Sequence, residues 1–344
     1  MFFLVSLASV QYSGEKDFLG MPGKKVTHQI EDKSDPISKP EIIELVDQHN
    51  QPIWFGRYVS KVVCDDGLCR IASLWLFWDK VGDFYGFQIM ENDPLTKTDH
   101  IDFMDHDYAK LHEILSNKNW ALKDLQMEDL VVKHDIDGTS GATNIEYKDD
   151  LVDNAAYTCY TLWHAVYGET YKEVGRIINS RIDSLYLDQL MDSDKANYRI
   201  WAIKYVMNKP EYREIFGEKI MSLIRDKDDS VSQTALLFLT PSTLNTKIRE
   251  DMLTQYGNLS FQRKLEVLIR LSEIKPVSDD IILFLLDDID LKKVNATLLT
   301  YIYKIIEKSN FENNQIHDKV VQLSRNDNQY IKQISRQLLV EIKE

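Results

Sequence analysis

The sequence predicts an α+β N-terminal domain, an antiparallel sheet with helices, followed by an all-α solenoid of helical pairs. Between Trp54 and Met90, β-branched and aromatic residues form three short runs separated by turn residues. From about Ser193 onward, amphipathic helical runs recur roughly every 30 to 40 residues, a period typical of stacked helical pairs. We therefore expect an α+β domain over residues 39–167, a helical connector over 168–192 and a repeat domain over 193–344.

Length and charge restrict the class of protein. The chain has 344 residues, of which 44% are hydrophobic and 28% charged, so it can bury the cores of two domains. Its formal net charge of −14 argues against nucleic-acid binding, because neutralising phosphates requires a basic surface. No stretch of about 18 uninterrupted apolar residues occurs, so no integral membrane segment is expected.

Residues 1–38 are predicted to be a signal-like segment and a flexible arm. Residues 1–10 are apolar and offer Ser6 and Ala8 as a cleavage pair, as a secretory signal does, although no basic residue precedes them. Export to the periplasm or cell envelope is our expectation, and a first β-strand is the alternative. Residues 13–39 are polar with little periodicity, which indicates a loose arm.

The next elements form the predicted sheet. A short helix is expected over residues 41–49, and strands are expected over residues 54–63, 68–78 and 84–90. We interpret these strands as an antiparallel meander. Cys64 and Cys69 flank its first turn, where a disulfide across a hairpin and two reduced thiols both remain open. Cys159 lies in a helical pattern and is interpreted as a small core residue.

His100, His106 and His112 lie among several aspartates and raise the question of a metal site. Ligands on one helix should lie three or four residues apart, whereas His106 and His112 are six apart and therefore on different faces. We expect no metal there. The segment is interpreted as solvated polar residues at the start of a helix over residues 106–116, capped by Asp105 or Asp107.

The most specific stretch is Asp137-Gly138-Thr139-Ser140-Gly141-Ala142-Thr143. Its glycines and alanine remove side-chain bulk, so a phosphate or ring can approach the main chain, and its hydroxyls face the cleared space. A Gly-containing turn capped by Asp137 is one alternative. Another begins at Asp135, because Asp135 to Thr139 resemble the first motif of Mg-dependent haloacid-dehalogenase phosphatases. That motif must end a buried strand of a Rossmann-like sheet, a context that the surrounding sequence lacks.

All seven residues match the pattern Asp-(Gly/Ala)-x-(Ser/Thr)-Gly-Ala-(Ser/Thr) of the FMN-binding domain in subunits of sodium-pumping NADH:quinone reductase and related complexes. This resemblance implies FMN joined to Thr143 by a phosphoester, which a separate flavin transferase installs from FAD with magnesium. It also implies that this loop presents the threonine to the transferase. The family's usual Glu-Thr-Pro-Gly segment is not recognisable here. The residues that the resemblance assigns to cofactor binding are Thr143, Asp137, Gly138, Ser140, Gly141 and Ala142.

What the resemblance implies for function is electron transfer to a redox partner protein, without substrate chemistry or catalytic residues. A helix is predicted over residues 150–167 and ends at Gly168. Its aromatic residues are candidates for lining the flavin ring, with ordinary core packing as the alternative. These candidates are Tyr157, Tyr160, Trp163 and His164.

The repeat units resemble HEAT-like repeats in pattern more than in sequence. The segments Asp228-Asp229-Ser230 and Asn326-Asp327-Asn328 are expected to cap two of their helices. We expect the repeats either to dock the flavin domain onto a partner or merely to enlarge and stabilise the fold. For the whole chain, the second hypothesis is a flavin-free protein-binding scaffold. The predicted helices span residues 197–207, 211–224, 230–239, 244–255, 261–271, 278–286, 291–306, 313–323 and 330–342.

Overall fold

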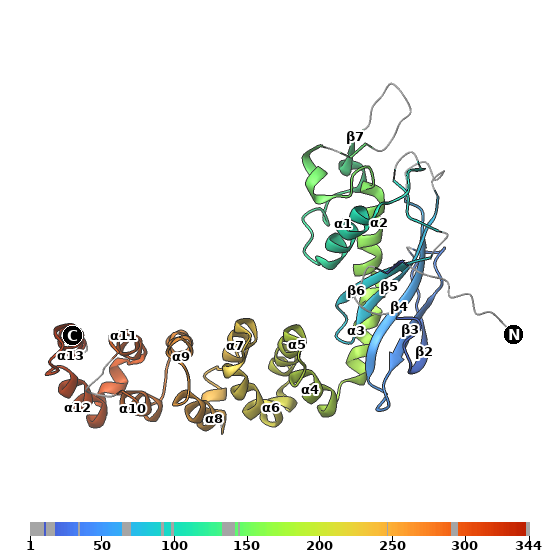
Figure 1. Ribbon diagram of the computed structural model, residues 1–344. Helices are drawn as coiled ribbons and strands as arrows, with labels where there is room; N and C mark the ends of the chain where they lie inside the picture. The colour runs from blue at the N-terminus through green and yellow to red at the C-terminus, as the bar shows by residue number, and fades with distance from the viewer. Residues whose placement is uncertain are drawn as a thin grey trace. The chain divides into compact units, whose positions relative to one another are not determined.

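The chain forms two compact units, Met1–Asp183 and Ser184–Glu344 (Figure 1). The predicted connector, residues 168–192, is divided between them, and each unit is described by itself. The computed structural model describes residues 10–11, 18–33, 35–63, 70–90, 93–97, 100–132, 142–143, 145–245, 247–289 and 295–341.

The first unit contains a six-stranded antiparallel sheet with strand order β1-β6-β5-β4-β3-β2. Strands β2 to β6 pair in sequence order, which confirms the predicted meander, and the two-residue strand β1 pairs with β6. The strands are β1 (Val10–Gln11), β2 (Lys24–Gln29), β3 (Glu41–Val46), β4 (Pro52–Lys61), β5 (Ala72–Asp79) and β6 (Phe84–Ile89).

Two local predictions differ from the structure. The helix expected over residues 41–49 is wrong, because this segment forms β3 with side chains buried on both faces, and such a short apolar run has no clear period. The segment expected as a loose arm contains β2. The side chains of this edge strand are only exposed or half-buried, and its sequence accordingly lacks the apolar residues that would have marked a strand.

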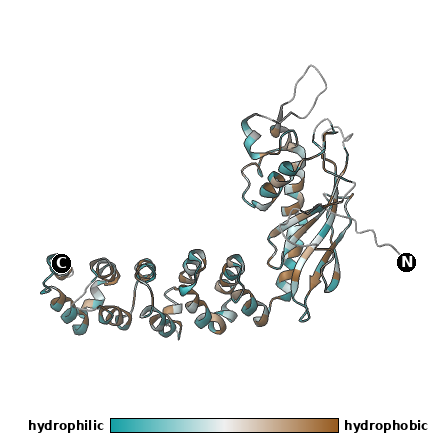
Figure 2. Cartoon of the chain, viewed as in Figure 1, coloured by the Kyte–Doolittle hydropathy of each residue, from teal (hydrophilic) through white to brown (hydrophobic). Residues whose placement is uncertain are grey.

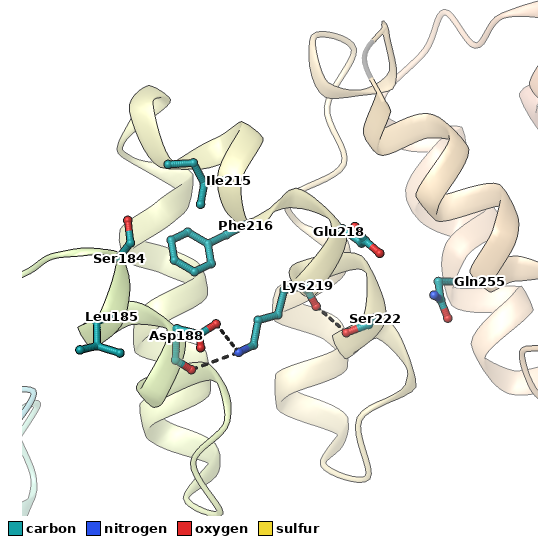
Figure 3. A pocket seen from close by; sticks show the side chains of 9 residues that line it. All are labelled: Ser184, Leu185, Asp188, Ile215, Phe216, Glu218, Lys219, Ser222 and Gln255. Carbon is teal, nitrogen blue, oxygen red and sulfur yellow. Dashed lines mark hydrogen bonds and ion pairs between the residues drawn. The ribbon is translucent and has the colours of Figure 1, made fainter.

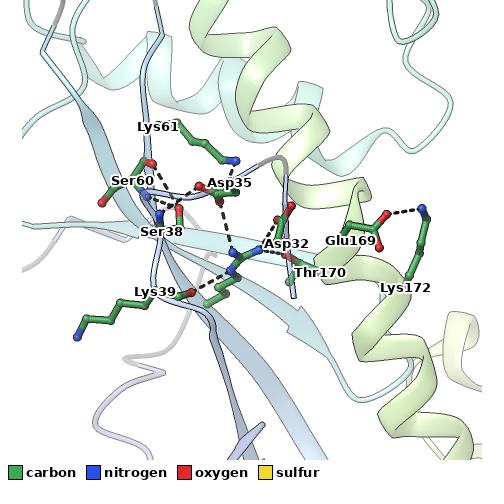
Figure 4. A network of polar contacts seen from close by, with 10 residues as sticks. Asp32, Asp35, Ser38, Lys39, Ser60, Lys61, Glu169, Thr170 and Lys172 are labelled. Carbon is green, nitrogen blue, oxygen red and sulfur yellow. Dashed lines mark hydrogen bonds and ion pairs between the residues drawn. The ribbon is translucent and has the colours of Figure 1, made fainter. Parts of the chain in front are cut away.

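The part of this predicted arm that follows β2 is held by the buried side chain of Arg57 in β4, which is 2% exposed. Its Nη1 donates to Asp32 Oδ2 at 2.9 Å and to Thr170 Oγ1 at 2.6 Å, and its Nη2 donates to Asp35 Oδ2 at 3.4 Å. Figure 4 shows these groups converging from the segment before β3 and from helix α3. Lys61 also pairs with Asp35, at 2.8 Å. The network therefore joins three separate parts of the unit.

Helices pack against the sheet. Helix α1 contacts β6, while α2 and α3 contact β4, and the indole nitrogen of Trp78 donates to the carbonyl of Val166 at 3.3 Å. A second apolar cluster is centred on Phe18, whose ring stacks on Phe77 at 4.4 Å and also packs with Trp54. The remaining elements are α1 (Asp105–Ser116), η2 (Met127–Leu130), β7 (Val131–Val132), β8 (Ala142–Thr143), η3 (Ile145–Asp150), α2 (Ala156–Tyr167) and α3 (Glu169–Arg181).

The second unit is a series of helical pairs, as predicted. Helices α5, α7, α9, α11 and α13 each contact the next in one row, and the intervening helices form a second row (Figure 1). Each helix carries both apolar and polar residues (Figure 2), as expected where one face is buried. The elements are α4 (Ser184–Met191), α5 (Ala196–Met207), α6 (Pro210–Ser222), η4 (Leu223–Arg225), α7 (Asp229–Leu236), η5 (Thr243–Asn245), α8 (Lys247–Tyr256), α9 (Phe261–Glu273), α10 (Asp279–Asp287), α11 (Ala296–Ile305), η6 (Lys308–Glu312), α12 (Asn314–Leu323) and α13 (Gln329–Glu341).

The expected helix caps are present. Asp228 Oδ1 accepts from the N–H of Ser230 at 2.9 Å, and Asn328 Oδ1 accepts from the N–H of Tyr330 at 2.9 Å. Among the residues that the structure describes, no helix is both long and apolar enough to cross a bilayer.

Gly217 in helix α6 packs directly against Ile248 of helix α8. A Cβ at this position would lie 2.7 Å from Cγ1 of Ile248, so a larger side chain forces the Ile248 side chain or its helix to shift. We expect Gly217→Leu to lower the free energy of unfolding by about 1–3 kcal/mol, measured by urea denaturation. Gly175 is the matched control, because no atom lies within 4 Å of its added Cβ. Gly175→Leu should be neutral or stabilising, and equal losses at both positions would contradict the packing argument.

Candidate functional site

The last two residues of the predicted motif, Ala142 and Thr143, form one strand of a small hairpin. Strands β7 and β8 pair antiparallel, with Val131 opposite Thr143 and Val132 opposite Ala142, in a two-stranded sheet separate from the large one. The structure thus places Thr143 and Ala142 in β8. The other four predicted site residues lie outside the described residues: Asp137, Gly138, Ser140 and Gly141.

Both ends of this hairpin are held by buried groups. Leu130, directly before β7, is fully buried at the end of η2, and η2 contacts α2. After β8, η3 ends at Asp150, whose carbonyl accepts from the indole nitrogen of Trp120 at 3.2 Å. The next residues, Leu151 and Val152, are buried. Thr143 therefore lies in a hairpin that is flanked by buried residues, Leu130 before β7 and Leu151 after η3.

The aromatic residues of α2 hold a neighbouring segment of chain. Tyr160 Oη donates to the carbonyl of Leu125 at 3.0 Å, and Trp163 Nε1 donates to that of Asn117 at 3.0 Å. Tyr157 is buried. These contacts favour the packing interpretation over the flavin-lining one, because the polar ends of two of these side chains already bind main-chain carbonyls.

His164 lies against the same aromatic cluster. Its ring centroid is 4.3 Å from that of Tyr160 and 5.1 Å from that of Trp163. Burial lowers the pKa of His164, and the nearby carboxylate of Asp124 acts in the opposite direction. The imidazole is therefore favoured in its neutral form near pH 7, in which it can pack against aromatic rings at little desolvation cost.

The histidines around α1 take part in local contacts. Asp107 Oδ2 accepts from the N–H of Met104 at 2.9 Å, which helps to close the start of α1, although the N-cap residue is Met104 and not the expected Asp105 or Asp107. The other oxygen of Asp107 pairs with Lys97 at 2.7 Å and lies 3.2 Å from the exposed ring of His106. Within the described ranges, no group of three His, Cys, Asp or Glu side chains is arranged to hold a metal ion.

Cys159 is a buried thiol, as predicted, whereas Cys64 and Cys69 lie outside the described residues. Burial raises the pKa of Cys159 to about 12. At pH 8 the reactive thiolate should then be about one part in ten thousand. In a Cys64→Ser, Cys69→Ser variant we expect a disulfide reagent to modify Cys159 only after unfolding in urea. Equal rates in native and unfolded protein would contradict this burial.

The strand directions bear on the phosphatase interpretation. Both described sheets are antiparallel, and β7, the strand nearest to Asp135, pairs with β8 in a hairpin. A phosphatase of that class instead needs its motif at the end of a parallel strand. The antiparallel pairing therefore opposes this interpretation.

The chemical group in this region that could attach FMN is the hydroxyl of a threonine, which can form a phosphoester. Compared with known proteins, the chain significantly matches no family model, no curated protein and no solved structure. The functional interpretation consequently rests on the residues of the motif and on the position of Thr143.

Proposed function

We propose that the chain is an extracytoplasmic flavoprotein that transfers electrons through FMN linked covalently to Thr143. The complete seven-residue match from Asp137 to Thr143 carries this proposal. FMN itself supplies one- or two-electron redox chemistry, and the protein provides attachment and orientation. A covalent bond suits a site outside the cytoplasm, where a lost flavin could not be replaced.

The short hairpin supports the attachment step. A modifying enzyme must surround the hydroxyl that it modifies, so the acceptor segment has to leave the main fold locally. β8 has only two residues and pairs with one partner strand, so few main-chain hydrogen bonds oppose such opening. The buried residues on either side, Leu130 and Val152, would keep the rest of the unit folded while the transferase acts.

The helical unit has a docking role in this proposal. An electron carrier without substrate chemistry must meet a donor and an acceptor protein, and helical repeats offer extended surfaces for such contacts. The repeats would bring the flavin to its redox partner.

A flavin-free binding scaffold is the second candidate. The observation that favours it is the packing role of Tyr160 and Trp163, whose polar ends bind the carbonyls of Leu125 and Asn117. A scaffold needs no ring-binding wall on α2, and its helical repeats would bind partners in the same way.

Colour after denaturation separates the two candidates. The protein is co-expressed with a flavin transferase, exported, precipitated with acid and washed, so that non-covalent flavin is removed. The flavoprotein should keep its visible flavin absorbance in the denatured pellet. A colourless pellet, from a host that flavinylates a known substrate in parallel, would reject the flavoprotein and leave the scaffold.

A further inference from the structure

Strand β2 is an open edge of the large sheet (Figure 1). All six of its residues pair with β3, from Lys24 opposite Val46 to Gln29 opposite Glu41, without a shift in register. Among the described residues, no strand pairs with its other side. An edge of this kind presents main-chain donors and acceptors to which a further strand can add.

The outward-facing main-chain groups of β2 follow from its pairing. The N–H of Ile30 donates to the carbonyl of Pro40 at 3.0 Å, which continues the register between β2 and β3. Hydrogen-bonded and non-bonded positions alternate in an antiparallel pair, so every second residue before Ile30 bonds to β3. The N–H and C=O groups of the other residues, Lys25, Thr27 and Gln29, therefore point away from β3.

The inner side of β2 is fixed to the rest of the first unit. His28 Nε2 lies 2.7 Å from Oε2 of Glu44 in β3, a carboxylate that is fully buried. Arg181 of α3 contacts the same oxygen at 3.2 Å. Together with the pairing to β3, these contacts hold β2 in place, so an added strand would not have to order the edge first.

The exposed side chains at one end of β2 are basic. Residues 18–30 include Lys24 and Lys25 but no Asp or Glu, whereas the first unit as a whole contains 31 acidic and 18 basic residues. Lys25 Nζ donates to the carbonyl of Leu19 at 2.8 Å, and Lys24 Nζ donates to Asn50 Oδ1 at 3.4 Å. Both acceptors are neutral, so within the described part of the chain no ion pair compensates these two charges.

The groove on the helical unit differs from this edge, because its charged side chains already have partners of opposite charge (Figure 3). Lys219 pairs with Asp188 at 2.6 Å and with Asp192 at 2.8 Å. Glu218 lies 3.9 Å from Lys247. The charges of the groove therefore do not select an occupant, whereas those of β2 do.

We propose that the β2 edge binds an extended segment of a different protein, with acidic residues at the end that lies beside Lys24 and Lys25. The segment adds a strand to the sheet and exchanges main-chain hydrogen bonds with Lys25, Thr27 and Gln29. Its carboxylates approach the two ammonium groups, each of which carries three donors. At the other end the exposed Glu41 lies opposite Gln29 and disfavours acidic residues there.

The same two lysines oppose a second copy of the chain as the occupant. Pairing β2 with another β2 would bring the lysines of both strands to one edge, and like charges across a strand pair are destabilising. Lysines on edge strands commonly prevent such self-pairing. They do not oppose an acidic segment, whose charge is complementary, so they discriminate between the two occupants.

Selection from a library of short random peptides tests the proposal on the full-length chain. Peptides are selected on the parent protein after removal of those that bind a Thr27→Pro variant. Proline removes an outward N–H, and an edge strand tolerates it because this N–H does not bond to β3. We expect the enriched peptides to be rich in Asp or Glu. Failure to enrich any peptide, or enrichment of basic ones, would overturn the proposal.

Methylated forms of the most enriched peptide then test main-chain pairing without any change in the protein. Every second amide of an added strand points toward β2, so N-methylation of one alternating set should weaken binding by at least about tenfold, and N-methylation of the other set much less. Fluorescence anisotropy measures the affinity. Thr27→Ala keeps the main-chain N–H and should bind the peptide as the parent does. Equal effects of the two methylated sets would exclude strand addition.

Reversal of the two lysine charges tests the location. Lys24→Glu with Lys25→Glu should weaken binding of the acidic peptide by at least about tenfold. Lys110→Glu with Lys172→Glu is the matched control, because it changes the net charge equally on α1 and α3 and should weaken binding by less than about threefold. Equal losses would refute the location at β2. Self-association of the parent that Thr27→Pro abolishes in sedimentation would identify a second copy instead.

Peptide binding at β2 goes beyond the proposed function and does not depend on it. Thr143→Ala protein should bind the peptide as the parent does, because Thr143 lies in the separate sheet of β7 and β8. If the parent carries no flavin but the peptide still binds at β2, the flavin proposal fails alone. If flavin is attached but no peptide is enriched, the β2 proposal fails alone.

Discussion

Thr143→Ala is expected to abolish an added mass of about 438 Da, FMN less water, that the parent protein acquires from a flavin transferase. The phosphoester needs a hydroxyl oxygen, and alanine has none. Intact-mass spectrometry of the exported, denatured protein measures the adduct directly. The main-chain pairing of Thr143 with Val131 does not depend on its side chain, so the fold should change in stability by less than about 1 kcal/mol.

Two further variants make this result specific. Thr143→Ser keeps a hydroxyl and should retain the adduct, because the motif accepts either residue at this position. Thr139→Ala removes a nearby hydroxyl at the variable position of the motif and should leave the adduct unchanged. An adduct that persists in Thr143→Ala, or an unmodified parent from a competent host, would contradict the assignment.

Arg57→Ala is expected to lower the free energy of unfolding of the first unit by about 3–5 kcal/mol. The substitution removes the guanidinium and leaves Asp32 and Asp35 buried with much of their compensating charge lost. It also removes the hydrogen bond that joins β4 to Thr170 in α3. Urea denaturation followed by tryptophan fluorescence measures the loss, since Trp54 and Trp78 lie in the same sheet.

The controls for Arg57 separate burial from charge. Arg176 also pairs with a glutamate, Glu173, at 2.8 Å, but its side chain is 76% exposed, so Arg176→Ala should cost less than about 1 kcal/mol. Adding Asp32→Asn and Asp35→Asn to Arg57→Ala should recover part of the stability, because neutral amides are cheaper to bury. A loss at Arg57 no larger than that at Arg176 would show that the network is not important for stability.

The helical unit was the most predictable part of the chain. An amphipathic helix is a local pattern, so residues such as Asp228 and Asn328, followed by apolar residues at helical spacing, are sufficient to locate its start. The pairing of successive helices then follows from short connections. The exposure of Leu185 and Ile215 was not predictable, because an apolar residue at helical spacing is ordinarily expected to be buried.

The sequence predicted the strands whose own residues favour a strand. It missed the strand that forms only by pairing with a neighbour. Strands β4, β5 and β6 contain aromatic and β-branched residues separated by turns, whereas β2 depends on pairing with β3. Asp32 and Asp35 appeared to belong to a polar arm. They are part of the fold because a buried arginine more than 20 residues away binds both.

For the candidate site, local chemistry and tertiary contacts contribute different information. The sequence alone was sufficient to propose Thr143 as the acceptor, from the spacing of the Asp137–Thr143 motif, and to establish the acidic character of the chain, which follows from composition. Only the tertiary structure decided that Tyr160 and Trp163 bind main-chain carbonyls and that Lys219 of α6 pairs with Asp188 of α4 and with Asp192 after it. Such contacts depend on which segments meet after folding, and residues far apart in the sequence carry no local pattern that reveals their meeting.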